Sequence, residues 1–151
     1  MKHPKHLVTD KETSLRMSKV KLKKGDAEVM LAKGLWHKGY RYQLNCKALP
    51  GSPDIAISKY KVAIFVDGEF WHGYDWQNKK KRLCRNRDYW VEKIEENMAR
   101  DNRVNMELRA IDWIPVRFWS NEVLEDCEGC INDIEDLIIS IKRSDFLYDN
   151  S

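Results

Sequence analysis

The chain has 151 residues, of which 34% are charged and 42% hydrophobic, and its formal net charge is +3. This length suits a single domain with a real core, and this composition excludes a disordered or membrane-embedded chain. No apolar run approaches the roughly 18 residues that span a bilayer, and the amino-terminal segment lacks the apolar region of a signal peptide, so we expect a cytoplasmic protein.

Two helices are predicted at the amino-terminal end. Apolar residues recur at helical spacing from Ser14 to about Lys38. Gly25 and Asp26 interrupt this pattern, and Asp26 is a good N-cap for a second helix that ends near Gly39. Residues 1–13 are expected to form a flexible basic arm before a domain that spans residues 14–151.

Three strands are predicted next. The segment "YRYQLN" alternates as a strand does, and "ALPGSPD" is a turn in which Pro and Gly supply the backbone angles. "DIAISKYKVAIFVDG" then predicts two strands joined by a tight turn at Ser58–Lys61. If the two strands pair in this way, Asp54 and the region around Val66 and Asp67 lie at the same end of the sheet.

The second half of the chain predicts a helix, a strand and a helix. Apolar residues recur at a period near 3.6 over residues 88–112, and "WIPVRFW" is a strand in which Pro115 favours an edge or a bulge. An amphipathic helix closes the chain from Asp126 onward. The whole order predicts a mixed sheet with helices on its faces, an α/β domain.

Charge is distributed unevenly along this order. Residues 1–24 carry eight Lys or Arg against two acids, and residues 79–87 carry six basic residues and no acid. From Glu122 onward nine acids accompany two bases. Lys-rich stretches are often solvated surface and nothing more, but two separate stretches indicate a polyanionic partner such as nucleic acid.

The cysteines give a weaker signal. Cys127 and Cys130, in "CEGC", have the spacing of a zinc or redox knuckle. A structural zinc needs two further ligands, and the chain has no second CxxC or HxxxH; Cys46 and Cys84 could complete a four-thiolate site only if the fold brought them to this pair. Reduced thiols without a ligand are the favoured interpretation, and whether this pair binds zinc stays open.

Four side chains form the candidate catalytic group: Glu28, Asp54, Asp67 and His72. Hydrolysis of a phosphodiester bond requires charge neutralisation on the phosphate and an oxygen nucleophile, and a divalent metal held by carboxylates supplies both. Asp54 begins one strand and Asp67 ends the next, so these side chains can gather with Glu28 and His72 at one open edge. A neutral His can act as a general base near pH 7.

Each of these residues also has a purely structural interpretation. Asp54 can cap its Pro-rich turn, and Asp67 with the following Gly can form a hairpin turn. Phe70 and Trp71 can be core residues. A functional site is favoured because two aromatic residues and a His follow a turn-like Gly immediately.

The segment "LPGSPDIAISKYKVAIFVDGEFWHG" resembles the core motif of the very short patch repair (Vsr) endonucleases, DNA mismatch nickases with the PD-(D/E)xK nuclease fold. "RMSKVKLKKGDAE", in which Met17 precedes Glu28 by eleven residues, is similar to the family's amino-terminal segment. "YWVEKIEENMARDNRVNMELRAIDWIPVRFW" is similar to its later helix and strand. The resemblance covers about residues 14–122 and implies a restriction-endonuclease-like three-layer α/β/α domain with a central mixed sheet.

The resemblance also implies roles for the catalytic group. Asp54 would be the principal carboxylate for one or two Mg²⁺ ions, and the main-chain carbonyl of Val66 would complete the inner coordination sphere. Glu28 would hold a water of the metal. His72 would lie near the attacking water, and Asp67 stands where some members have a second catalytic His.

DNA contacts are implied on two segments. Met17 and the aromatic pair would form a wedge that enters the base stack beside a mismatch, where unstacking costs least. The basic run after residue 78 would contact phosphates. The candidate DNA-binding residues are Met17, Phe70, Trp71, Lys79, Lys80, Lys81 and Arg82.

The chain departs from the family pattern at the structural zinc. Glu69 stands where a Cys usually precedes Phe-Trp, and "GYDWQ" replaces the following Cys/His cluster. Ser120 and Asn121 follow the last strand's Trp, where a final Cys is expected. We therefore predict that the family's structural zinc is absent, with Tyr74 and Trp76 packed in its place.

The leading hypothesis is a Mg²⁺-dependent endonuclease that nicks one strand of double-stranded DNA at a T·G mismatch. A restriction-type or structure-specific endonuclease on the same scaffold is the close alternative. A DNA-binding module without catalysis and an α/β protein that binds an acidic partner are weaker ones. Mismatch-repair proteins or a companion DNA methyltransferase are candidate partners, and a monomer suffices to nick one strand.

Overall fold

The computed structural model describes residues 11–68 and 87–149, and for residues 11–23, 87, 90, 148 and 149 it describes the backbone alone. None of the described helices has the length and apolar character needed to cross a membrane. The elements are α1 (Lys11–His37), β1 (Gln43–Leu44), β2 (Ile55–Ile57), β3 (Val62–Asp67), α3 (Arg87–Ala110), β4 (Ile114–Trp119), α4 (Ser120–Glu125) and α5 (Cys127–Asp149).

The described strands form one four-stranded mixed sheet in the order β1-β2-β3-β4. β2 is antiparallel to β1 and β3, whereas β3 and β4 run parallel, with Ile64 opposite Val116. Every residue of β3 is buried, as expected for a strand that has a neighbour on each side and helices over both faces. β4 lies at the edge of the described sheet, which confirms the edge position predicted from Pro115.

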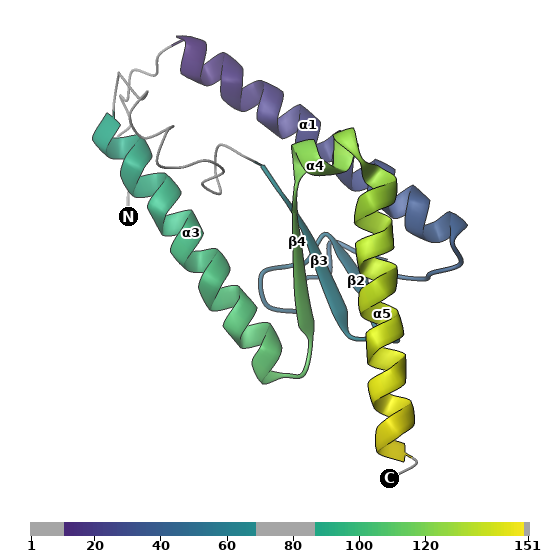
Figure 1. Ribbon diagram of the computed structural model, residues 1–151. Helices are drawn as coiled ribbons and strands as arrows, with labels where there is room; N and C mark the ends of the chain where they lie inside the picture. The colour runs from purple at the N-terminus through teal and green to yellow at the C-terminus, as the bar shows by residue number, and fades with distance from the viewer. Residues whose placement is uncertain (1–10, 69–86, 150–151) are drawn as a thin grey trace.

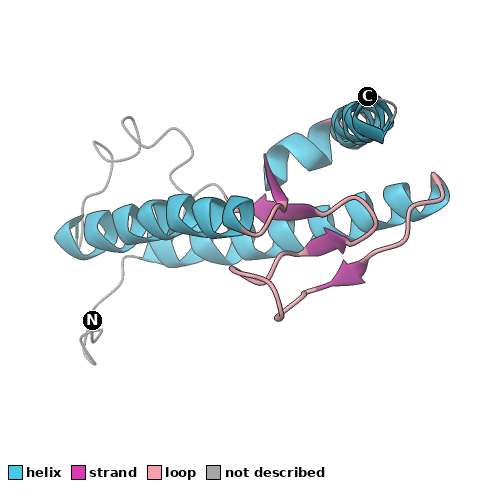
Figure 2. Ribbon diagram, turned by 90° about the horizontal axis from the view of Figure 1, so that it is seen from below, coloured by secondary structure: helices cyan, strands magenta, loops and turns pink. Residues whose placement is uncertain are grey.

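Helices cover both faces of the sheet, which confirms the predicted three-layer α/β/α architecture. The main core joins β2 and β3 to apolar side chains of α1, α4 and α5, among them Leu31, Val123 and Ile134. On the opposite face, Val104 and Leu108 of α3 pack on Ala63 and Phe65. Figure 1 shows α3 on one side of the strands and α1 with α5 on the other, and Figure 2 shows α5 nearly end-on.

The amino-terminal region differs from its prediction, because α1 is one continuous helix and not two. Gly25 costs a helix only about 1 kcal/mol relative to Ala. Lys24 and Glu28 form an i,i+4 ion pair that spans this glycine, and Ala27 and Leu31 anchor the next turns in the core. Packing and the ion pair therefore carry the helix through the predicted break.

Two other elements differ in extent. β1 keeps only two of the six residues predicted for it: residues 40–42 lie outside the strand, and Asn45 ends it in a left-handed conformation (φ 48°). The short helix α4 was not predicted; it follows β4 directly and turns the chain toward α5. The helix predicted over residues 88–112 and the tight turn at Ser58–Lys61 are both present.

Candidate active site

The loop before β2 is fixed at both ends by main-chain hydrogen bonds. Asn45 N–H donates to the Asp54 carbonyl (3.1 Å), and Cys46 N–H donates to the Pro53 carbonyl (3.0 Å). Between these bonds Gly51 adopts a left-handed conformation (φ 75°), and its Cα lies so close to Val104 of α3 that a Cβ would meet the Val104 side chain at 2.5 Å. This tight loop holds Asp54 at the end of the sheet.

The Asp54 carboxylate is fixed to the neighbouring strand. Its Oδ2 accepts a hydrogen bond from the Val66 main-chain N–H at 2.8 Å. The N–H and C=O of one strand residue point to the same side of that strand, so the Val66 carbonyl faces the side on which Asp54 lies. Asp54 and the carboxyl end of β3 are therefore neighbours, as the sequence predicted.

Glu28 reaches this end of the sheet from α1, through Lys24. The Lys24 ammonium donates to the Glu28 carboxylate and also lies 3.4 Å from Asp54 Oδ1. The Lys24 side chain is 33% exposed, whereas that of Asp54 is only 14% exposed. One cation thus joins two carboxylates from two different elements.

Burial and charge shift the pKa values of this group. Burial raises the pKa of Glu28, the Lys24 hydrogen bond opposes the rise, and the negative charge of Asp54 adds to it. For Lys24, burial lowers the pKa, but the hydrogen bond to Glu28 and the charges of Asp54 and Glu28 outweigh that effect, so the pKa is raised. The ammonium therefore stays charged at neutral pH, between two negative partners.

A cavity of about 170 Å³ adjoins Asp54. Asp54, Val66 and Asp67 line it from the sheet, and Lys24 lines it from α1. α3 contributes both charge signs with Arg100 and Asp101, and Arg117 of β4 completes the wall. Carboxylates and basic groups thus share one small space, which suits a metal ion and a phosphate side by side.

Asp67 lies in this wall but is held by Arg117. Arg117 Nη1 contacts the two carboxylate oxygens of Asp67 at 3.2 and 3.1 Å, and the guanidinium lies over the Phe65 ring at 4.1 Å. Its Nε donates to Asn105 at 2.8 Å, and Asp101 lies 3.5 Å away. Asp67 is thus in an ion pair that crosses from β3 to β4 and α3.

The residues around Asp54 fit a hard divalent cation. Mg²⁺ takes oxygen ligands and typically binds through one or two protein carboxylates, with water and phosphate in its remaining positions. Asp54 and Glu28 are two such carboxylates, and the Lys24 ammonium already lies where both attract positive charge. In the described part of the chain no group of three or more His, Cys, Asp or Glu side chains is arranged to hold an ion. The Asp67 carboxylate is held in its ion pair with Arg117.

The structure places some predicted residues and leaves others untested. Glu28, Asp54, Val66 and Asp67 all lie at one end of the sheet, as expected. Their neighbours Lys24 and Arg117 were missed. The spacing of four residues between Lys24 and Glu28 is visible in the sequence. The contacts of Lys24 with Asp54 and of Arg117 with Asp67 are not, because they join distant segments. The predictions that lie outside the described residues or side chains concern Met17, Glu69, Phe70, Trp71, His72, Tyr74, Trp76, Lys79, Lys80, Lys81 and Arg82.

The "CEGC" cysteines lie in the first turn of α5. Cys130 is buried in the main core, and burial, reinforced by the charge of Glu122, raises the pKa of its thiol to about 11. Burial also raises the pKa of Cys127. Thiolates are the species that bind metal, so a metal at this pair would have to overcome both shifts. Cys84 lies outside the described residues.

Comparisons with known proteins agree on one family. The family profile described as DNA mismatch endonuclease Vsr matches residues 6–78. The chain is 40% identical over 131 residues to the type II nicking enzyme V.NmeDIP of Neisseria meningitidis serogroup C, covering 87% of this chain and 88% of that protein. The chain belongs to the Vsr family. Membership makes it a DNA endonuclease.

Two further relatives are similar to this chain over about three quarters of its length. The type II nicking enzyme V.HpaIIP of Haemophilus parainfluenzae is 45% identical over 111 residues, which are 74% of this chain and 79% of that protein. The DNA mismatch endonuclease Vsr of Escherichia coli K12 is 32% identical over 113 residues, which are 74% and 72% of the two chains. The resemblance on which the site residues were assigned is thus a family relationship.

Proposed function

We propose that this Vsr-family chain is a Mg²⁺-dependent endonuclease that nicks one strand of double-stranded DNA at a T·G mismatch. The observation that supports it most directly is the pairing of Glu28 and Asp54 beside a cavity with basic walls. The relatives named as nicking enzymes, and the one named as a mismatch endonuclease, support the type of cut.

Three groups of this chain would hold the metal. The Asp54 carboxylate and the Val66 carbonyl face the same side, and Glu28 approaches from α1. Bound there, Mg²⁺ would neutralise charge on the scissile phosphate and make an oxygen nucleophile available. The Val66 N–H orients the Asp54 carboxylate through the 2.8 Å hydrogen bond, so that one carboxylate oxygen is held by the protein.

Residues other than the metal ligands are proposed to transfer the proton and to bind the phosphate. His72 is proposed as the general base that takes the proton of the attacking water. Asp67 is proposed as a further catalytic residue, and its ion pair with Arg117 also orients that guanidinium in the cavity wall. Arg100 and Arg117 supply positive charge to a phosphate in the cavity.

Recognition of the mismatch is assigned to the wedge. Met17, Phe70 and Trp71 would enter the stack beside the mispair, where unstacking costs least. Lys79, Lys80, Lys81 and Arg82 would neutralise phosphates of the flanking duplex. The specificity for T·G over other mispairs is the part of the proposal that most needs direct measurement.

A nicking assay tests this function. End-labelled duplexes, matched or carrying one T·G mispair in a randomised context, are incubated with Mg²⁺ or with EDTA. We expect single-strand cuts only in the mispaired duplex with Mg²⁺, and a loss of at least a thousandfold in Asp54→Ala, because one carboxylate ligand is removed. Asp145→Ala, an exposed acid on α5, is the matched control and should cut like the wild type.

The outcomes separate the alternatives. Cutting of matched and mispaired duplexes alike would favour a restriction-type or structure-specific endonuclease. Binding without any cut in the randomised pool would favour a DNA-binding module without catalysis. Full activity in EDTA, or in Asp54→Ala, would show that the proposed metal site is wrong.

A further inference from the structure

Lys24 is the basic residue whose placement the proposed reaction does not use. Its ammonium contacts Glu28, four residues on in the same helix, and Asp54, which precedes β2. The side chain lines the wall of the cavity and is 33% exposed. An ordinary surface i,i+4 pair would involve Glu28 alone. The second contact, across 30 residues of sequence, ties α1 to the end of the sheet.

The two carboxylates would repel each other without a cation between them. The Lys24 ammonium contacts an oxygen of each carboxylate, so the two negative charges lie close enough to act on each other. An ammonium placed between them cancels this repulsion and holds the two carboxylates close to each other. The same oxygens are the donors that a divalent cation requires, so the ammonium and the metal compete for them.

We propose that Lys24 is a built-in counter-ion of the metal site: it holds Glu28 and Asp54 together in the metal-free protein and is displaced when a divalent cation binds. This inference rests on the proposed metal site and adds a residue to it. Its consequence is that Lys24 weakens metal binding in the absence of DNA. In this role Lys24 is a positioning residue.

The local structure allows the displacement. Lys24 has four methylene groups between backbone and ammonium, and one third of its side chain is in contact with solvent. Its contact with Asp54 is long, at 3.4 Å, whereas Val66 N–H holds the other Asp54 oxygen at 2.8 Å. The ammonium can therefore leave while the Asp54 carboxylate keeps its orientation. Arg117, fixed by Asp67, Asn105 and Phe65, has no comparable freedom.

Metal affinity measured without DNA tests the proposal. Mn²⁺ serves as the probe, with calorimetry and with the rise in melting temperature on Mn²⁺ addition. We expect Lys24→Met to bind Mn²⁺ on the order of tenfold more tightly than the wild type, because a positive charge within a few ångströms is removed. Lys24→Arg should bind like the wild type or more weakly, since it keeps the charge.

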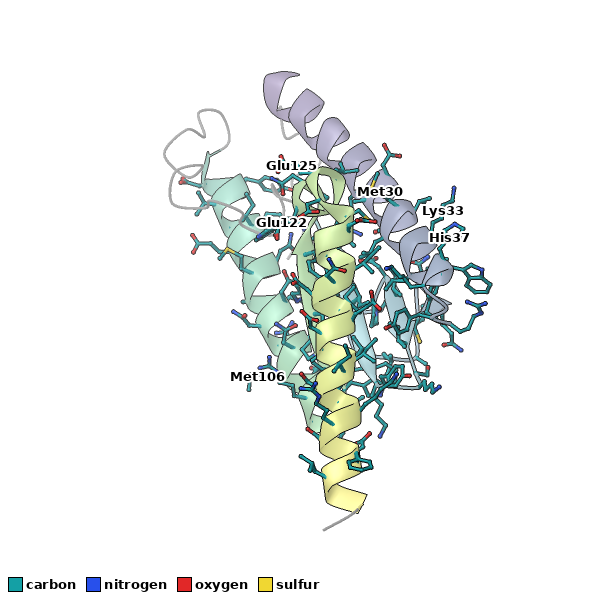
Figure 3. The ribbon with its side chains drawn as sticks, turned by 45° about the vertical axis from the view of Figure 1, so that its right-hand side comes forward. Met30, Lys33, His37, Met106, Glu122 and Glu125 are labelled. Atoms are coloured by element: carbon teal, nitrogen blue, oxygen red, sulfur yellow. The ribbon has the colours of Figure 1, made fainter. Side chains whose placement is uncertain are left out.

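Lys33→Met is the matched control. Lys33 lies in the same helix, is exposed, and points away from the strands on the outer side of α1, so its loss changes net charge equally (Figure 3). Its Mn²⁺ affinity should equal that of the wild type. Asp54→Asn reports the site itself and should abolish the binding.

The Mn²⁺ affinities of these variants distinguish the counter-ion role from its alternatives. Unchanged or weaker Mn²⁺ binding in Lys24→Met, with wild-type binding that Asp54→Asn removes, would overturn the counter-ion role and leave the metal site standing. Equal tightening in Lys33→Met would overturn it as well, since net charge alone would then explain the effect. Wild-type protein without Asp54-dependent binding would overturn the metal site and this inference together. If Lys24→Met does not fold, Lys24→Gln replaces it with the same expectation.

Discussion

Arg117 shows how a single side chain can organise the wall of the site. Its guanidinium contacts both oxygens of Asp67, donates a hydrogen bond from Nε to Asn105 Oδ1 at 2.8 Å, and covers the Phe65 ring. Its side chain is 19% exposed and that of Asp67 only 9%. A carboxylate buried to this degree requires a charged partner, because desolvation of an unpaired charge costs several kcal/mol. Arg117 therefore stabilises Asp67 where it stands.

Replacement of Arg117 by Met should destabilise the fold by roughly 3 kcal/mol, because it leaves the Asp67 charge buried without its guanidinium partner. Urea denaturation at pH 7 measures the change in the free energy of unfolding. The same substitution in an Asp67→Asn background should cost clearly less, since no charge is then left behind. A double-mutant cycle with equal costs in both backgrounds would show that the ion pair contributes nothing and that Arg117 acts through packing on Phe65.

At the scale of elements, the sequence predicted which segments form helices and strands better than where those segments begin, end and meet. Two apolar segments joined by the tight turn at Ser58–Lys61 predicted the β2–β3 hairpin, and this hairpin places Asp54 beside Val66. The break predicted at Gly25 was wrong, because local propensity was outweighed by packing of the following turns in the core. Such tertiary contacts cannot be predicted from the residue type at a single position of the sequence.

The contacts of the site depend on register in the same way. Arg117 lies opposite Phe65 because β3 and β4 pair in parallel, and that pairing joins residues about 50 positions apart. The sequence pattern identifies both strands as apolar but does not say how far one is shifted along the other. The Arg117–Asp67 pair and the reach of Lys24 to Asp54 could thus be found only in three dimensions.

The loop that carries Asp54 makes a prediction at this scale. Gly51→Ala should cost roughly 2–4 kcal/mol of stability, because it adds backbone strain at positive φ and a clash with Val104. Gly39 is the matched control: its φ is also positive, at 95°, but a Cβ there meets nothing within 4 Å. Gly39→Ala should therefore cost only about 1 kcal/mol, the backbone strain alone.

The urea midpoints of the two glycine variants, at unchanged slope, give the comparison. Equal losses would show that α3 yields to the added methyl group and that close packing does not hold the loop. A larger loss in Gly51→Ala, accompanied by slower nicking, would show that packing against α3 also positions Asp54.

At the scale of the whole molecule, charge is separated along its length. The amino-terminal ends of α1 and α3 lie at the same end of the molecule in both Figure 1 and Figure 2, and α5 ends at the opposite end. Basic residues dominate residues 1–24, and the basic run 79–87 leads in the chain into α3. The acids that follow Glu122 lie mainly on α4 and α5. DNA is expected to approach the basic end.

This charge separation predicts how DNA binding responds to salt. Each phosphate that the protein neutralises contributes about −0.9 to the slope of log affinity against log salt. Lys79→Ala/Lys80→Ala should therefore reduce the steepness by up to about 1.8, if each lysine contacts one phosphate. Lys142→Ala/Arg143→Ala on α5 removes the same charge from exposed positions near the other end and should leave the slope unchanged. Fluorescence anisotropy of a labelled duplex without Mg²⁺ measures all three slopes.

A wild-type slope near zero would refute phosphate contacts by the basic run. Equal reductions in both double variants would show that net charge, and not contact, attracts the DNA.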